Sequence, residues 1–315
     1  MKIALLFPGQ GAQYSGMGKS FYDQFPETRP IFEQADAALG FSLTQTIFSG
    51  TEEDLKQTKI TQPAIFTVSC AAYTVFAEHC PTLLAQSAMV AGHSLGEYSA
   101  LVAAGAFDFG TGIQLVRARG NSIQKCCDAS AGAMAAVLGV EREMLKSLCK
   151  ETKQGDDFCE CVNFNCPGQI VVAGTKSAVD NLTRKTLGIA GAKVIALAVS
   201  GAFHSKLMRP AALEMKAVLA AHTVHDCRVP VLTNFDAAET VTAADVREKL
   251  YLQIDHPVLW EDSIQRMIVS GIDTFIELGP GRVLSGLMRK IDRKKTVFNI
   301  EDADSLAKIK QGLSL

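Results

Sequence analysis

The sequence predicts an α/β protein with a mainly parallel sheet and a smaller α/β unit inserted into it. Two short apolar stretches of strand length, residues 2–7 and 87–91, are each followed by segments with helical spacing. Strands that alternate with helices imply crossover connections, which favour parallel pairing. Residues 132–199 depart from this alternation, because their order is β-α-β-β-α-β, which is typical of a ferredoxin-like unit. The chain of 315 residues is long enough for both units.

Turn and cap residues mark the elements of the larger unit. The first strand stops at Pro8-Gly9, Thr51 is a suitable N-cap, and Gln62-Pro63 starts a long apolar helix. In chain order we expect a strand at 2–7, helices at 22–39, 52–56 and 64–76, a strand at 87–91, helices at 95–104, 111–126 and 207–221, a strand at 229–233, a helix at 245–254, a strand at 274–278, a helix at 283–291 and a strand at 296–300.

The inserted unit is expected to have strands and helices of its own, with Pro167-Gly168 as the turn between its second and third strands. This division assigns residues 1–127 and 198–315 to the larger unit and residues 128–197 to the smaller one. A cleft between two such units is a common place for a small-molecule site. We expect strands at 132–140, 159–165, 170–174 and 193–199, and helices at 141–152 and 177–187.

The composition excludes several classes of function. With 48% hydrophobic and 20% charged residues and a net charge of -2, the chain has no field that would hold a phosphate backbone, so we expect no nucleic-acid partner. The first apolar run is too short for a signal peptide, and no apolar run is long enough to span a membrane. The nine cysteines form no CxxC pair and lack a nearby histidine at zinc-ligand spacing. We therefore expect reduced thiols, no metal site and a cytoplasmic protein.

The segment Gly92-His93-Ser94-Leu95-Gly96 predicts a sharp turn from a strand into a helix. Glycines two residues before and after Ser94 are needed where the backbones pass too closely for a Cβ. Such a turn exposes the hydroxyl at a helix N-terminus, where unpaired N–H groups stabilise negative charge. This geometry suits the nucleophile of an acyl transfer. The alternative is a structural turn in which Ser94 is only an N-cap.

Three further features bear on the chemistry of the turn. The loop Gly9-Gln10-Gly11 lacks the third glycine of a dinucleotide-binding fingerprint, so it instead offers a bare backbone N–H to a ligand. Among the six histidines, His204 follows a strand in a loop of small residues, where catalytic groups are common. Arg119 lies among small and apolar residues and needs an anion if it points inward.

Four motifs resemble the malonyl-CoA:acyl-carrier-protein transacylase family. They are Phe7-Pro8-Gly9-Gln10-Gly11-Ala12-Gln13, Gly92-His93-Ser94-Leu95-Gly96-Glu97-Tyr98, Gly201-Ala202-Phe203-His204-Ser205 and Glu277-Leu278-Gly279-Pro280-Gly281. They stand in the order of the family, and the similarity covers essentially the whole chain. The resemblance implies an α/β-hydrolase-like core with a ferredoxin-like insertion, in agreement with the order of elements above.

The resemblance also implies a role for individual residues. Ser94 would be the nucleophile and His204 its general base, with the backbone carbonyl of Gln253 orienting the imidazole in place of an aspartate. The backbone N–H groups of Gln10 and Leu95 would form the oxyanion hole. Arg119 would bind the free carboxylate of malonate, and Phe203 would favour malonyl over methylmalonyl groups. Polar positions near the pocket would be Gln62, Asn163, Asn165 and Asn234.

The implied function is a ping-pong transfer of malonyl from malonyl-CoA, through Ser94, to the phosphopantetheine thiol of an acyl carrier protein, in steps that need no cofactor. A serine esterase or thioesterase is the nearest alternative, but the chain has no HGGG-type loop and no acidic strand end before His204. Arg119 would have no role in a simple esterase. A non-catalytic module that binds carrier proteins is the second alternative, and the presence of Ser94, His204 and Arg119 disfavours it.

Overall fold

The computed structural model describes residues 1–199 and 201–312, and it has the predicted α/β fold class. A large lobe is built on a six-stranded sheet with the strand order β10-β9-β1-β2-β7-β8. Every pair in this sheet is parallel except β7 with β8. The strands are β1 (Ile3–Phe7), β2 (Ser87–Gly92), β7 (Val231–Leu232), β8 (Glu239–Thr240), β9 (Thr274–Leu278) and β10 (Thr296–Ile300).

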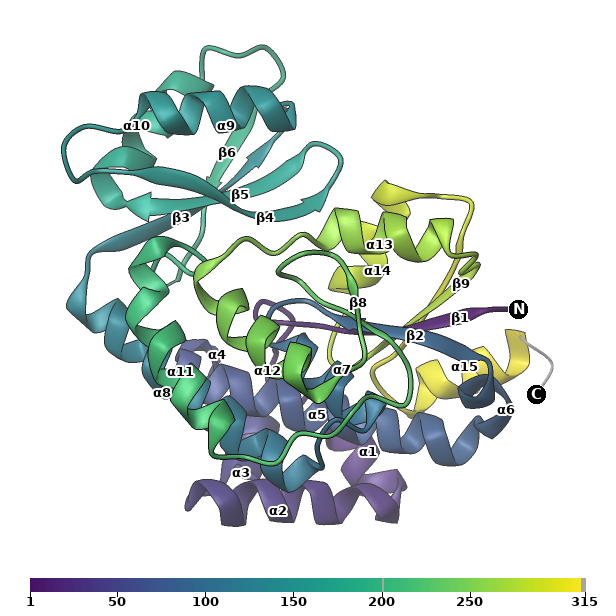
Figure 1. Ribbon diagram of the computed structural model, residues 1–315. Coiled ribbons are helices and arrows are strands. Elements are labelled where there is room, and N and C mark those ends of the chain that lie inside the picture. Colours follow the sequence, from purple (N-terminus) through teal and green to yellow (C-terminus); the bar gives the residue numbers. More distant parts are fainter. Residues whose placement is uncertain (200, 313–315) are drawn as a thin grey trace.

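Helices cover both faces of this sheet (Figure 1). Alternate residues of β1 explain the two layers, because Ile3, Leu5 and Phe7 pack in the larger core, whereas Ala4 and Leu6 pack against α13 and α14. The helices are α1 (Lys19–Gln24), α2 (Arg29–Leu39), α3 (Leu43–Ser49), α4 (Glu52–Lys56), α5 (Thr58–His79), α6 (Pro81–Ala85), α7 (Gly96–Ala104), α8 (Phe109–Ala129), α11 (Arg209–Ala220), α12 (Ala243–Leu252), α13 (Trp260–Val269), α14 (Val283–Ile291) and α15 (Ala303–Gly312).

Helix α5 is the one described helix that is long and apolar enough to cross a membrane. Its most apolar window is 78% buried inside the protein, as expected for the central helix of a core. It packs against α7 and α8 in the larger core. The length and hydropathy of α5 therefore reflect burial within the large lobe.

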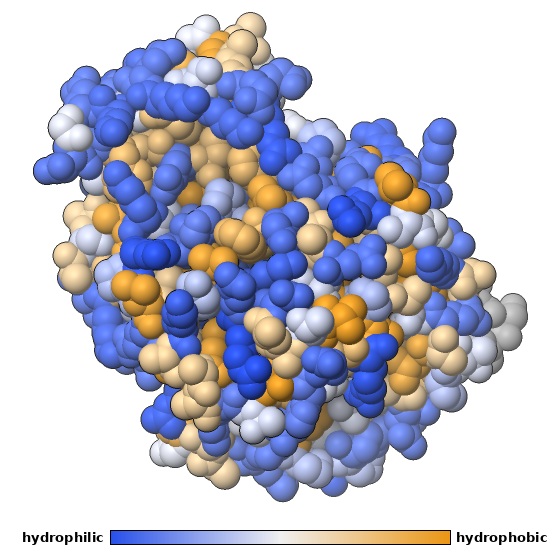
Figure 2. Space-filling model, viewed as in Figure 1, coloured by the Kyte–Doolittle hydropathy of each residue, from blue (hydrophilic) through white to orange (hydrophobic). Residues whose placement is uncertain are grey.

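The small lobe, at the top of Figure 1, has a four-stranded antiparallel sheet with the order β4-β5-β3-β6. The expected order of elements is present: β3 (Gly132–Leu138), α9 (Arg142–Glu151), β4 (Cys159–Cys166), β5 (Gln169–Thr175), α10 (Lys176–Thr186) and β6 (Lys193–Ala196). One face of the sheet packs against α9 and α10, and the other faces Ala202 and Phe203 of the large lobe. Figure 2 shows a hollow with apolar walls under the hydrophilic rim of this lobe.

Several predicted bounds were wrong, and each error has a local cause. The helix expected at 22–39 is interrupted at Phe25, where an extended residue precedes Pro26 and starts a short 3-10 turn. Pro63 does not start α5, which begins five residues earlier and holds the proline in its interior. The sequence patterns also missed the short elements α3, α6 and β8, and the amphipathic helices α13 and α15.

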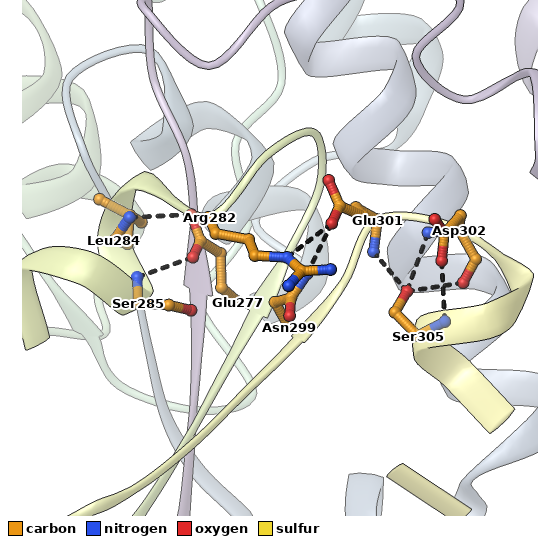
Figure 3. A network of polar contacts seen from close by, with 8 residues as sticks. All are labelled: Glu277, Arg282, Leu284, Ser285, Asn299, Glu301, Asp302 and Ser305. Atoms are coloured by element: carbon orange, nitrogen blue, oxygen red, sulfur yellow. Dashed lines mark hydrogen bonds and ion pairs between the residues drawn. The ribbon is translucent and has the colours of Figure 1, made fainter. Parts of the chain in front are cut away.

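The C-terminal end of β9 is held to the first turn of α14 by a buried carboxylate (Figure 3). Glu277 is fully buried, and its two oxygens accept hydrogen bonds from the N–H groups of Leu284 at 2.9 Å and Ser285 at 2.7 Å. A carboxylate is favourable here because the first N–H groups of a helix lack intrahelical acceptors. Burial nevertheless raises the pKa of Glu277. The contact fixes the start of α14, which forms part of the wall of the site described next.

Candidate active site

Ser94 lies on the predicted sharp turn between β2 and α7. Its φ of 51° is in the left-handed region, which is unusual for a residue with a side chain. A Cβ on Gly92 would overlap the backbone of Gly96, and a Cβ on Gly96 would overlap the carbonyl of Phe7. The two glycines are therefore required by close backbone contacts, and the turn directs the Ser94 hydroxyl into a cavity.

His204 faces Ser94 from the loop that follows the small lobe. Its Nε2 lies 2.7 Å from Ser94 Oγ, and its Nδ1 lies 2.8 Å from the carbonyl oxygen of Gln253. Because a carbonyl only accepts, Nδ1 carries the proton and Nε2 is free to accept one from the hydroxyl. Burial and the nearby Arg119 charge lower the pKa of His204 to about 3. The imidazole is therefore neutral at ordinary pH, as a general base must be.

Arg119 points inward from α8 and is 2% exposed. Its Nη1 donates to Gln62 Oε1 at 2.8 Å, and its Nη2 donates to Ser94 Oγ at 3.0 Å and to Gln253 Oε1 at 3.1 Å. Within residues 1–199 and 201–312 it forms no ion pair. Burial lowers the pKa of the guanidinium. The three contacts of Arg119 thus place a buried guanidinium, bound by neutral oxygens, next to the candidate nucleophile.

Asn234 lies behind the turn, which differs from its expected place beside substrate. Its Nδ2 donates to the carbonyl of Gly92 at 2.7 Å, and its Oδ1 accepts from the N–H of Ser94 at 2.6 Å. Asn234 is fully buried, and both ends of its amide are occupied by the backbone. These contacts indicate a role for Asn234 in holding the left-handed conformation of Ser94.

The cavity beside Ser94 has a volume of about 310 Å³ and lies between the two lobes. The other expected residues line it: Gln10 and Leu95 next to Ser94, Phe203 next to His204, and Gln62, Asn163 and Asn165 as polar groups of the wall. Asn165 Oδ1 also lies 2.9 Å from His93 Nε2, which keeps His93 in contact with the small lobe. Apolar residues of both lobes complete the wall, including Met134, Val171, Met208 and Leu287.

Two features of the site were missed by sequence reasoning. The side chain of Gln253, of which only the backbone carbonyl was predicted to matter, bonds to Arg119 and also donates to the carbonyl of Ser94 at 2.9 Å. Glu97 is fully buried three residues after Ser94 and accepts from Gln253 Nε2 at 3.0 Å. The sequence did contain one sign of this buried carboxylate, because Glu97 stands in the otherwise mostly small and apolar segment 95–104.

All nine cysteines are buried, and residues 1–199 and 201–312 contain no group of side chains arranged to hold a metal ion. The functional groups gathered at the site are a serine hydroxyl, an imidazole, a guanidinium and backbone N–H groups.

The chain is similar to known proteins over nearly its whole length. Residues 4–314 match the acyl transferase domain family. The malonyl CoA-acyl carrier protein transacylase of Bacillus subtilis is 43% identical over 97% of this chain and 95% of its own, and that of Haemophilus influenzae is 36% identical over 99% of both. The crystal structure of an acyl carrier protein S-malonyltransferase from Vibrio cholerae superposes with a TM-score of 0.93 at 38% identity, over 98% of this chain and 100% of that one.

A malonyl-transacylase solved in complex with its type II PKS acyl-carrier protein superposes equally well, with a TM-score of 0.93 at 36% identity over 99% of this chain and 100% of that one. The family model matches nearly the whole chain, and the chain covers nearly the whole length of these relatives. The chain belongs to the acyl transferase domain family.

Proposed function

We propose that this protein transfers a malonyl group from malonyl-CoA to the phosphopantetheine thiol of an acyl carrier protein, through an ester on Ser94. The observation that carries the proposal is the buried guanidinium of Arg119, which lies 3.0 Å from the Ser94 hydroxyl and has no direct carboxylate contact among the described side chains. A buried guanidinium whose direct partners are all neutral can still bind an anion, and the free carboxylate of malonate supplies one. The names of the relatives agree with this substrate.

The first half-reaction forms the ester. His204 Nε2 takes the proton of the Ser94 hydroxyl as Oγ attacks the thioester carbonyl, and Gln253 stabilises the resulting imidazolium through its carbonyl. The carbonyl oxygen becomes negative, and the N–H groups of Gln10 and Leu95 are the proposed donors to it, since both residues line the cavity next to Ser94. The carbon–sulfur bond then breaks, and the imidazolium returns its proton to coenzyme A.

The second half-reaction reverses these roles. The phosphopantetheine thiol gives its proton to His204 and attacks the ester carbonyl. The carbon–oxygen bond to Ser94 breaks, and the serine regains a proton from the imidazolium. The relative solved with its carrier protein supports a macromolecular acceptor for this step.

Arg119 and Phe203 are the proposed determinants of acyl selectivity. A planar guanidinium binds a carboxylate through two parallel hydrogen bonds, so it orients malonate and discriminates against acetate. In the absence of substrate, Nη2 donates to Ser94 Oγ, and malonate would displace this contact. Phe203 lines the cavity beside the base, where its ring takes volume that an α-methyl branch needs. Gln62 would hold the guanidinium, and Asn163 and Asn165 would complete the polar wall.

We infer that the large lobe, residues 1–127 and 198–315, is an α/β-hydrolase-like core, and that residues 128–197 form a ferredoxin-like subdomain. The parallel order of the core strands and the order β4-β5-β3-β6 of the small sheet support this description. We also infer a cytoplasmic location, in line with nine buried cysteines among which no disulfide is described.

Transfer to a carrier protein is the direct test of the proposed function. The purified protein is mixed with malonyl-CoA and a phosphopantetheinylated carrier protein, and both thioesters are followed by mass spectrometry. We expect malonyl on the carrier thiol and parallel lines in double-reciprocal plots, which indicate a ping-pong mechanism. Release of free malonate at the same rate with or without the carrier would instead indicate a thioesterase.

A further inference from the structure

A buried carboxylate is separated from Arg119 by a single amide group. This carboxylate belongs to Glu97, which is fully buried on the first turn of α7. Its Oε2 accepts from Nε2 of Gln253 at 3.0 Å, and Oε1 of the same amide accepts from Nη2 of Arg119 at 3.1 Å. The amide of Gln253 thus connects a carboxylate to a guanidinium without direct contact between the two charges.

Glu97 also connects the groups that hold Ser94. Its Oε2 accepts a second hydrogen bond, from the N–H of Asn234 at 2.9 Å. Asn234 fixes the N–H of Ser94, and Gln253 fixes the carbonyl of Ser94. Both contacts that stabilise the strained peptide of Ser94 therefore converge on one carboxylate oxygen. The other oxygen, Oε1, is buried and has no hydrogen-bond partner among the described residues.

We propose that Glu97 is a positioning residue and the buried counter-ion of Arg119, acting through the side-chain amide of Gln253; this inference rests on the proposed function. A direct salt bridge would neutralise Arg119 and compete with the carboxylate of malonate. A counter-ion beyond an amide keeps the guanidinium charged and oriented, and it leaves the face toward Ser94 free for substrate. The same amide residue supplies the carbonyl that orients His204.

The arrangement makes the site sensitive to pH through Glu97. Burial raises the pKa of Glu97 to about 7, while the hydrogen bonds from Asn234 and Gln253 and the charge of Arg119 act in the opposite direction. The other titratable groups that interact with Glu97 are Asp236, whose charge raises the pKa of Glu97, and the neutral hydroxyl of Tyr98 on the same helix. Protonation of Glu97 removes the counter-charge and weakens both hydrogen bonds that Oε2 accepts.

The test compares wild-type protein with Glu97→Gln, which keeps a carbonyl acceptor but carries no charge. We expect kcat/KM for malonyl loading to be about ten- to thirtyfold lower in the variant at pH 8, because two charge-assisted hydrogen bonds become neutral ones. At pH 6 most Glu97 is protonated in the wild type, so the ratio of wild-type to variant kcat/KM should narrow to about two- to fourfold. The same ratio at both pH values would overturn the proposal, since a purely structural role does not depend on the charge.

A matched control is Glu261→Gln. Glu261 is a partly buried carboxylate on α13 whose pKa is also raised, and it does not line the cavity. We expect its substitution to leave the pH profile unchanged. If Glu261→Gln also removed the change of kcat/KM between pH 6 and pH 8, the assignment of that change to Glu97 would be contradicted.

A second measurement needs no activity. Infrared difference spectra of wild-type protein and Glu97→Gln identify the protonated carboxyl band of Glu97, and its midpoint is followed with pH. In Arg119→Ala this midpoint should move to higher pH, because the guanidinium no longer favours the charged carboxylate. An unchanged midpoint would overturn the coupling. If wild-type protein failed to load malonyl, the proposed function would fall while this measurement still decided whether the two charges interact.

Discussion

Replacing Arg119 by alanine should convert a malonyl-selective site into one that tolerates acetyl. In the resting site Nη1 and Nη2 each face a neutral oxygen or the nucleophile, so both are available for a carboxylate. A hydrogen bond to a charged group contributes about 1.5 to 3 kcal/mol, and two of them amount to about 3 to 6 kcal/mol. With each 1.4 kcal/mol equal to about a factor of ten, kcat/KM for malonyl-CoA should fall about 100- to 10,000-fold.

The assay is single-turnover loading of Ser94 from malonyl-CoA and from acetyl-CoA, quenched and followed by intact mass. Acetyl has no carboxylate, so its loading should stay comparable or rise in Arg119→Ala. Arg117→Ala is the matched control, because Arg117 lies on the same helix but is exposed and donates to the carbonyl of Ala38. An equal loss for both acyl groups would refute carboxylate recognition by Arg119.

Three further predictions follow from individual contacts. Phe203→Ala should raise the kcat/KM ratio of methylmalonyl-CoA to malonyl-CoA by about 10- to 100-fold, since a methyl group in an apolar pocket is worth about 1 to 3 kcal/mol; an unchanged ratio in a panel of acyl-CoAs would exclude the ring as the steric determinant. Glu277→Ala leaves two buried N–H groups of α14 without acceptors and should lower the free energy of unfolding by about 3 kcal/mol in urea titrations, whereas a change below about 1 kcal/mol would contradict the buried cap. Because burial lowers the pKa of His204 to about 3 from 6.5, the unfolded chain binds a proton below pH 6.5 that the folded protein does not, and stability falls with falling pH. Between pH 6 and pH 4 wild-type protein should lose about 2.5 kcal/mol more than His204→Asn, and equal losses would show that His204 is not buried as a neutral imidazole.

Sequence patterns predicted the elements that have sharp local boundaries. The helix after Thr51, the strand before Gly279-Pro280-Gly281 and the helix at 283–291 have the expected bounds, because caps and turn residues stop them within one position. The start of α5 was wrong because its first turns, including Pro63, are held by tertiary burial and not by their own signals. The amphipathic helix α13 was missed although its buried face contains Trp260, Ile264 and Met267 at helical spacing.

The site shows the same division between local and long-range information. Ser94 is predictable because the glycines on either side of it form a recognisable local pattern, although Gly96 is also required by its contact with the distant carbonyl of Phe7. His204 is predictable only as a histidine in a loop of small residues, and the resemblance to a family was needed to give it a role. The bonds that join Glu97 to Gln253 and Asn234 link residues 156 and 137 positions apart. No local pattern contains such contacts, so the support of the active site became visible only in the fold.

The most direct test of the central claim is the identity of the residue that carries malonyl. The protein is incubated with malonyl-CoA in the absence of a carrier, quenched in acid and digested, and the peptides are sequenced by mass spectrometry. We expect one malonyl ester, on the peptide that contains Ser94. It should be absent in Ser94→Ala and discharged when carrier protein is added. A protein that transfers malonyl without this ester, or that carries it on another residue, would contradict the account.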